Sequence, residues 1–193
     1  MPSRQEELLD AAIAVLGGQG VRQLTHRAVD AAAGLPPGST SNYFKTRDAL
    51  VAGIVDRFAS RERAAWETIA ALVRPATADE LAGALAAFVH RATGPERVLT
   101  LARYSLFMEA ALRPDLQETL AETARTVRQW GAGWLRDLGA ADPEAGCQFV
   151  LDHLDGIMLH QLAMPDAEFD PGPAIANLVR AVLPDQASRP LSR

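Results

Sequence analysis

The stretch GLPPGSTSNYFKTRDAL, residues 34–50, decides how the sequence is interpreted. It holds two glycines, two prolines and a series of short hydroxyl and amide side chains, and it lies between two segments with the apolar periodicity of helices. So few large apolar residues cannot build a core, whereas small polar side chains suit close contact with another molecule. The elements on either side therefore determine what this segment does.

The composition of the chain is that of a soluble globular protein. Of its 193 residues 48% are hydrophobic, no apolar run approaches a membrane span of about 20 residues, and charged residues interrupt any signal-peptide pattern at the start. We therefore predict a cytoplasmic protein with no membrane partner. The single cysteine, Cys147, allows no internal disulfide and no cysteine-based metal site, and it is expected to be a small buried residue.

The net charge of −5 does not exclude a nucleic-acid partner, because the acidic excess lies outside the N-terminal segment. Residues 21–50 carry Arg22, Arg27, Lys45 and Arg47 against only two aspartates. A small basic excess of this kind fits a phosphate-facing surface, although a solvated face would look the same.

Helical periodicity extends over almost the whole chain, and no segment alternates convincingly as a strand does. Cap residues, glycines and prolines mark where the helices begin and end. Thr25 and Thr77 are expected to cap helices, and Gly34 is expected to end the second helix in a left-handed conformation. Gly17 and Gly18 are expected to stop the first helix, and Pro36 and Pro37 are expected to lie in the first turn of the third. We predict an all-α fold of about nine helices, which run over residues 3–17, 25–34, 36–44, 46–73, 77–92, 95–112, 114–138, 143–164 and 173–183.

The second and third of these helices predict a helix-turn-helix. Two short helices joined through a glycine-containing turn and braced by a third form this motif, and its second helix enters the major groove of DNA. In PPGSTSNYF, residues 36–44, polar side chains can reach phosphates and base edges while Phe44 anchors the helix in the core. The competing interpretation is a polar surface turn.

The order of these elements resembles the TetR family of bacterial repressors over about residues 5–57. The features that carry the resemblance are an amphipathic helix, a Gly-Val step, a Thr-capped helix, an Ala-Gly turn, a glycine in the recognition helix and a basic-acidic-x-Leu entry to the fourth helix. The resemblance implies that residues 25–27 meet the DNA backbone and groove edge, that residues 39–43 read the major groove, and that Arg47 takes a phosphate-binding position. The predicted DNA-binding residues are Thr25, His26, Arg27, Pro37, Gly38, Ser39, Thr40, Ser41, Asn42, Tyr43, Lys45 and Arg47.

Three positions depart from the family pattern. Pro36 stands where a serine commonly opens the recognition helix, so no side-chain cap is expected there. Ser41 stands where the family usually has a phosphate-contacting tyrosine, and Tyr43 where a histidine is common. Which of Ser41, Asn42 and Tyr43 faces DNA is therefore left open, and an operator sequence cannot be transferred.

Large side chains on helical faces mark the remaining two thirds of the chain. Indole, phenol and imidazole groups combine an apolar body with a polar tip, which suits a cavity for a hydrophobic or aromatic small molecule. The competing interpretation is a filled core. The predicted ligand-binding residues are Trp66, Phe88, Tyr104, Phe107, Met108, Trp130 and His153. His153 and His160 lie too far apart along a helix to share one ion, so neither a metal nor another cofactor is expected.

A surplus of apolar surface near residues 115–138 and 144–164 predicts a homodimer, in which two helices from each subunit form a four-helix bundle. The alternative is that these helices close their own domain. The predicted interface residues are Leu116, Leu120, Val127, Trp134, Phe149, Leu154, Ile157 and Gln161.

These elements predict a helix-turn-helix DNA-binding domain over residues 1–46, a helical regulatory, ligand-binding and dimerisation domain over 47–184, and a flexible tail over 185–193. No nucleophile motif, phosphate-binding loop or carboxylate pair marks a catalytic site, so we do not expect an enzyme. The predicted function is that of a repressor that binds a palindromic DNA operator as a homodimer and is released by a small apolar or aromatic effector. The alternative is a helical carrier or enzyme whose N-terminal helices are structural.

Overall fold

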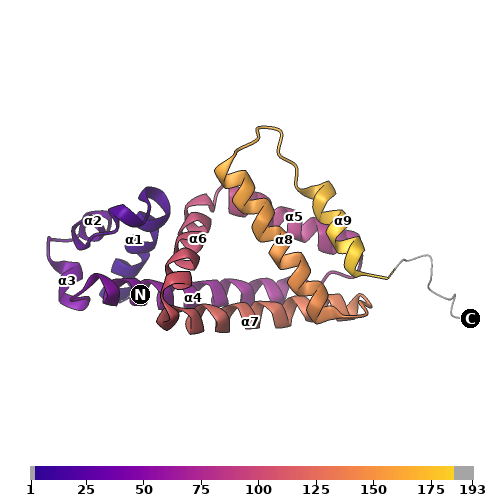
Figure 1. The fold of residues 1–193 in the computed structure, drawn as a ribbon, viewed down its shortest axis with the longest axis horizontal. Coiled ribbons are helices and arrows are strands. Elements are labelled where there is room, and N and C mark those ends of the chain that lie inside the picture. The colour runs from indigo at the N-terminus through magenta and orange to yellow at the C-terminus, as the bar shows by residue number, and fades with distance from the viewer. Residues whose placement is uncertain (1–2, 185–193) are drawn as a thin grey trace, which may run out of the picture. The chain divides into compact units, whose positions relative to one another are not determined.

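The computed structural model describes residues 3–184, and within this range the chain forms nine α-helices and no strand (Figure 1). The all-α prediction is therefore confirmed. The tail predicted over residues 185–193 lies outside the described residues. The elements are α1 (Arg4–Gln19), a short 3-10 helix η1 (Val21–Gln23), α2 (His26–Ala32), α3 (Ser39–Tyr43), α4 (Arg47–Leu72), α5 (Ala78–Thr93), α6 (Arg97–Leu112), α7 (Pro114–Asp137), α8 (Pro143–Ala163) and α9 (Gly172–Val182).

Two of the predicted helix ends are wrong. Gly17 does not stop α1, which continues to Gln19 and is followed by Gly20 at φ 83°. A Cβ on Gly17 would lie 1.8 Å from the carbonyl oxygen of Val98, so this glycine instead lets α6 approach α1 closely. Pro36 and Pro37 precede α3 rather than lying in its first turn, because the N-cap is Gly38 in a left-handed conformation.

The described residues divide into two compact units. The first unit holds the residues up to 65 together with 95–124, and the second holds 66–94 together with the residues from 125 onward. The predicted DNA-binding segment falls within the first unit. Helix α4 contributes residues to both units, since its first part belongs to one and its last turns to the other.

The core of the first unit is built by α1, α2, α4 and α6. Leu8, Leu16, Val29, Ile54 and Leu106 are fully buried there, and burying each such side chain contributes about 1.5–3 kcal/mol. Helix α1 packs against both α2 and α6 (Figure 1). These contacts hold the short helices α2 and α3 on a stable base.

A charged cluster ties α1 to α4 at the edge of this core. The Arg57 guanidinium donates to both oxygens of Asp10 at 2.9 and 2.8 Å, and to Glu6 at 2.7 Å. Hydrogen bonds from Arg57 also hold the pKa of Asp10 below its ordinary value. Because the Arg57–Asp10 pair is bidentate, it fixes the orientation of the two helices as well as their contact.

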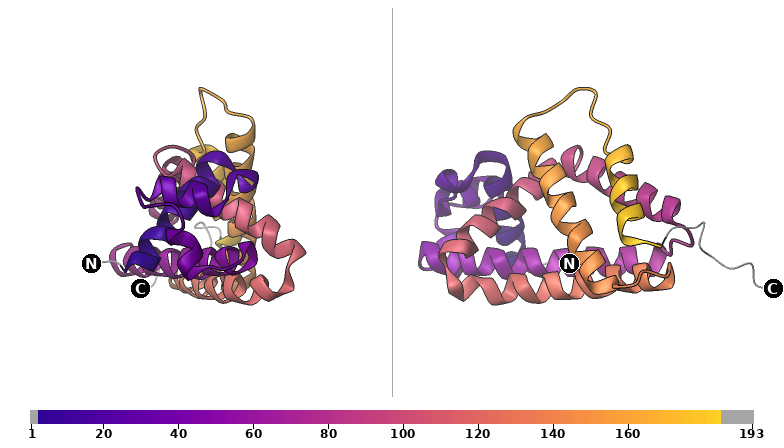
Figure 2. Two further views of the ribbon diagram at one scale, coloured as in Figure 1. Left: turned by 90° about the vertical axis from the view of Figure 1, so that its left-hand side faces the viewer. Right: turned by 45° about the vertical axis from the view of Figure 1, so that its right-hand side comes forward.

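The second unit is formed by α5, α8 and α9 with parts of α4 and α7. Helix α5 packs against α8 and α9, and α8 also contacts α9 (Figure 2). Val89, Leu154, Met158, Ile175 and Val179 are buried among these helices. Across residues 3–184, none of the helices combines the length and apolar character that crossing a membrane would require.

Candidate DNA-binding head and ligand cavity

The turn between α2 and α3 is set by the two ends of α2. The Thr25 hydroxyl accepts a hydrogen bond from the Ala28 amide at 3.1 Å, which caps the start of the helix. At the other end Gly34 adopts φ 66°, a left-handed conformation that glycine tolerates, and the Leu35 amide donates to the Asp30 carbonyl at 2.9 Å. The chain therefore turns sharply from α2 into the segment that leads to α3.

Asp30 of α2 supplies the cap that α3 lacks in its own sequence. Its carboxylate accepts hydrogen bonds from the Gly38 amide at 2.7 Å, the Thr40 amide at 2.7 Å and the Thr40 hydroxyl at 2.5 Å. Burial acts to raise the pKa of this carboxyl, but the hydrogen bonds from Thr40 and Gly38 hold the pKa below its ordinary value. Asp30 was not among the predicted functional residues, and its one signal in the sequence is the absence of a capping side chain at Pro36.

Helix α3 has an exposed polar face and an anchored inner face. Ser41, Asn42 and Tyr43 are exposed, and Tyr43 keeps 48% of its surface accessible. Thr40, which was predicted to read the groove, is fully buried, and its hydroxyl donates to Asp30. The half-buried Ser39 donates to the Pro36 carbonyl at 2.7 Å. The side chains of α3 that are exposed to an approaching molecule are those of residues 41–43, and of these the Ser41 hydroxyl donates to the Gly38 carbonyl at 2.8 Å.

Two residues predicted to touch DNA hold the ends of the motif. His26 Nε2 donates to the carbonyl of Phe44 at 2.7 Å, so the carbonyl group of the residue that follows α3 has a hydrogen-bond partner. Arg47 donates to the carbonyls of Leu24 at 2.8 Å and Val21 at 3.2 Å, which connects the start of α4 to the segment before α2. The other predicted contacts, Thr25, Arg27, Pro37, Gly38 and Lys45, are exposed.

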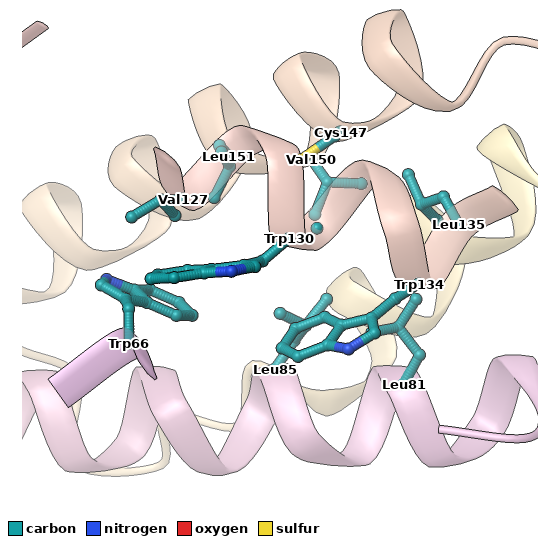
Figure 3. Close-up of a pocket in the computed structure, with 11 residues that line it drawn as sticks. Trp66, Leu81, Leu85, Val127, Trp130, Trp134, Leu135, Cys147, Val150 and Leu151 are labelled. Carbon is teal, nitrogen blue, oxygen red and sulfur yellow. The ribbon is translucent and has the colours of Figure 1, made fainter. Parts of the chain in front are cut away.

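The second unit contains a small apolar cavity of about 40 Å³ (Figure 3). Residues of four helices, α4, α5, α7 and α8, line it. Burial of the Cys147 thiol in its wall raises the pKa of this thiol to about 11, so the group is neutral. Figure 3 shows the side chains of Trp66, Trp130 and Trp134 converging on this inner cavity. The lining residues are Trp66, Leu81, Leu85, Val127, Trp130, Gly131, Trp134, Leu135, Cys147, Val150 and Leu151.

A second, more polar cavity shares two of these residues. It has a volume of about 260 Å³, and Trp130 and Trp134 line both it and the inner cavity. The inner cavity is far below the roughly 300–1,000 Å³ of a site for a drug-sized ligand, whereas the outer one approaches that range. The residues that line the outer cavity are Ala70, Arg74, Pro75, Gln129, Trp130, Gly133, Trp134 and Asp137.

The predicted ligand-binding residues fall into three places. Trp66 and Trp130 line the inner cavity, and Phe88 contacts Trp66 with ring centroids 5.4 Å apart. Tyr104, Phe107 and Met108 lie on α6 in the first unit. There the Arg103 guanidinium lies 4.7 Å from the centroid of the Phe107 ring, and Met108 is 67% exposed. His153 is exposed on α8, and its ring lies 4.1 Å from the Phe149 ring between centroids, tilted by 45°. Five apolar residues of the inner cavity were not predicted, because their spacing is also that of core residues: Leu81, Leu85, Leu135, Val150 and Leu151.

The predicted interface residues differ in exposure. Leu116 and Leu154 are buried, Leu116 in the first unit and Leu154 in the second. Phe149 is 40% exposed, and the remaining predicted residues Leu120, Val127, Trp134, Ile157 and Gln161 are half-buried. On α8 the exposed Phe149 is followed at helical spacing by the exposed residues His153, Gly156 and His160. Among residues 3–184 no three His, Cys, Asp or Glu side chains are grouped so that they could hold a metal ion.

Comparison with known proteins places this architecture in one family. The sequence pattern described as "Bacterial regulatory proteins, tetR family" matches residues 8–54, and that described as "Tetracyclin repressor-like, C-terminal domain" matches residues 76–185. The HTH-type transcriptional regulator BetI of Rhizobium meliloti is 30% identical over 164 residues, which cover 83% of this chain and 78% of BetI.

Solved structures agree with the sequence comparison. The multidrug binding protein EbrR in complex with ethidium is 27% identical, with a TM-score of 0.70 over 95% of this chain and 100% of EbrR. A member of the TetR family from Streptomyces coelicolor A3 is 28% identical, with a TM-score of 0.68 over 95% of this chain and 100% of that one. The chain is therefore a DNA-binding transcriptional regulator of the TetR family, and not an enzyme.

Proposed function

We propose that this regulator is a cytoplasmic repressor that binds a palindromic operator as a homodimer and is released by a small apolar or aromatic molecule. The observation that carries the proposal is the exposed polar face of α3, residues 41–43, on a helix held at its start by the buried Asp30. A short helix fixed in this way presents hydroxyl and amide groups in one orientation, and base readout requires such an orientation.

Base contacts and phosphate contacts come from different residues in this proposal. Ser41, Asn42 and Tyr43 read the major groove, since they are exposed along α3. Arg27 in the first turn of α2 and Lys45 after the end of α3 contact phosphates, because their charged side chains are exposed. His26 and Arg47 act as positioning residues, because their side chains donate to backbone carbonyls of the head itself.

The exposed face of α8 is the proposed homodimer contact. Phe149 and Leu159 are 40% and 50% exposed on this helix, and Gly156 has no atom within 4 Å of where a Cβ would stand. A second copy of the same helix would bury this apolar face by a two-fold contact. Ile157→Arg should then yield a monomer in sedimentation at micromolar concentration, and a wild-type chain that already sediments as a monomer would refute the dimer.

Helix α4 is the proposed link between effector and operator. It carries Leu50 and Ile54 into the core of the first unit, and Trp66 into the inner cavity of the second. A ligand that displaces the Trp66 end would move the DNA-binding heads, which must stay about 34–36 Å apart to reach successive major grooves. Trp130 and Trp134, which line both cavities of the second unit, offer aromatic faces to an aromatic ligand, and the relative EbrR is solved with ethidium and with proflavin.

The test begins with selection of duplexes from a random library by the full-length protein. Palindromic sequences with salt-dependent affinity support the repressor, and random recovered sequences would overturn it. Thermal melts with a panel of aromatic and lipophilic compounds then identify effectors, and each effector is titrated with and without the selected duplex. Coupling is reciprocal, so the factor by which the ligand weakens operator binding must equal the factor by which the operator weakens ligand binding. A ligand whose affinity ignores the operator would refute the coupling.

A further inference from the structure

Two glycines and an alanine separate the paired tryptophans of α7 in the sequence WGAGW, residues 130–134. Glycine inside a helix is unfavourable relative to alanine, because it loses more conformational freedom on folding. A Cβ on Gly131 would lie 2.6 Å from the sulfur of Cys147, so packing of α8 requires this glycine. A Cβ on Gly133 would meet no atom within 4 Å, so packing does not require Gly133.

Gly133 lines the outer cavity together with Trp130 and Trp134. The two indoles also line the inner cavity, so they form the boundary that the two spaces share. Between them the helix presents bare backbone at Gly133, and a flat group can approach the helix more closely there than at any residue with a side chain. Arg74, Gln129 and Asp137 add a cation, an amide and a carboxylate to the wall of the same cavity.

We propose that the effector binds in the outer cavity, against Gly133 and between the indoles of Trp130 and Trp134. We expect the effector to be a flat aromatic molecule of about two or three fused rings with polar groups along one edge. A ligand of this size matches the outer cavity, whose volume is just below that of a site for a drug-sized ligand. Indoles favour offset or edge contacts with such rings, and the polar edge finds partners in Arg74, Gln129 and Asp137. This inference rests on the proposed function, whose effector it places and describes.

The experiment titrates the full-length protein with proflavin in the absence of DNA and follows tryptophan quenching. Gly133→Ala should raise Tm by about 2–4 °C, because a helical glycine is replaced, yet bind proflavin about tenfold more weakly. Gly133→Leu should abolish the binding. The matched control is Gly83→Ala in α5, since Gly83 also has no atom within 4 Å of a Cβ and lies outside both cavities. It should raise Tm equally and leave proflavin affinity unchanged.

A second control separates the two cavities. Leu151→Phe reduces the inner cavity only, so it should leave proflavin affinity within about twofold of wild type. A twofold change in affinity is smaller than the change that one misplaced methylene in a binding site causes. Loss of binding in Leu151→Phe together with wild-type binding in Gly133→Leu would overturn the outer site, and absence of proflavin binding to the wild type would overturn the ligand class.

Operator release is measured separately, with Gly133→Leu as the reference. Proflavin is a flat cation that also stacks in the duplex itself, and this weakens operator binding equally for wild type and Gly133→Leu. Only release from the wild type in excess of release from Gly133→Leu therefore reports binding at the proposed site. Excess release supports the proposal, and equal release from wild type and Gly133→Leu would overturn it. Failure of the wild type to bind any duplex would refute the repressor function, and the DNA-free titration would still decide the site.

Discussion

Replacement of Asp30 by asparagine tests whether one buried carboxylate holds the recognition helix in place. Asparagine has nearly the shape of aspartate, but it carries one acceptor oxygen and one NH2 group. Asp30 uses both oxygens, one for the Gly38 amide and the other for the amide and hydroxyl of Thr40. In Asp30→Asn an NH2 group therefore faces at least one N–H donor, whichever way the amide is turned.

The magnitude follows from the three hydrogen bonds. A hydrogen bond to a charged group contributes about 1.5–3 kcal/mol, and a buried donor left without a partner costs about 1–3 kcal/mol more. Losing one bond and stranding one donor should lower the free energy of unfolding by about 3–5 kcal/mol. For a chain of this length that corresponds to a fall in Tm of roughly 6–20 °C. Ordinary stability is about 5–15 kcal/mol, so after this loss the protein stays folded at 25 °C unless its stability lies at the lower end of that range, and the thermal melt shows whether DNA binding is measured on folded protein.

Operator affinity should fall by at least about tenfold, although the substitution removes a negative charge that repels phosphates. Fluorescence anisotropy with the selected duplex measures the affinity, and differential scanning calorimetry measures Tm. The control is Asp48→Asn, whose carboxylate is 79% exposed at the start of α4 and pairs with Arg113 at 3.1 Å. It should bind the operator as well as the wild type or slightly better. An Asp30→Asn protein with wild-type Tm and wild-type affinity would refute the reasoning.

Two further predictions concern the same unit. The pKa of Asp30 is lowered from its ordinary 3.8, so the stabilisation that its carboxylate gives is complete above about pH 5 and is lost as pH falls below 3.8. The Tm difference between wild type and Asp30→Asn should therefore shrink between pH 5 and pH 3. A constant difference would contradict this. Gly17→Ala should destabilise the protein by about 1–3 kcal/mol or more, because its Cβ would overlap the Val98 carbonyl. Gly18→Ala, with open space around the Cβ, should not lower Tm in a thermal melt. Equal Tm values for the two variants would contradict the close approach of α1 and α6.

The sequence was sufficient where a structural feature depends on neighbouring residues. Thr25 and Thr77 were identified as N-caps, and each accepts the expected amide hydrogen bond. Gly34 was expected to be left-handed after α2, and its φ of 66° confirms this. Local signals of this kind also set most helix ends within a few residues, because capping and glycine geometry act over a single turn.

The sequence was insufficient where the cause lies far along the chain. Asp30 caps a helix that starts nine residues later, and nothing in its own helix distinguishes it from a solvated aspartate. Gly17 was interpreted as a helix stop because the Val98 carbonyl that it accommodates belongs to α6. The cavities raise the same problem, since apolar side chains such as Leu81 and Leu85 show one spacing whether they surround a space or fill it.

The role of Arg47 bears on how strongly salt should control operator binding. A phosphate contact releases counterions and adds about 0.9 to the slope of log K against log salt for each phosphate neutralised. The Arg47 side chain is exposed, as are the proposed phosphate contacts Arg27 and Lys45, but its guanidinium donates to the carbonyls of Leu24 and Val21. Two such cations in each of two heads give a slope of about −4 in a homodimer, and a phosphate-binding Arg47 would add about −2.

Arg47→Ala should therefore weaken operator binding without changing that slope, because it loosens the segment before α2 rather than removing a phosphate contact. Arg27→Ala should instead flatten the slope by about 2 per homodimer. Anisotropy titrations at a series of salt concentrations distinguish the two effects. If Arg47→Ala flattens the slope as much as Arg27→Ala does, the guanidinium leaves the carbonyls of Leu24 and Val21 and contacts phosphate in the complex. A parallel line displaced to lower affinity means that it stays on those carbonyls, where it aligns the head for the bases that residues 41–43 read.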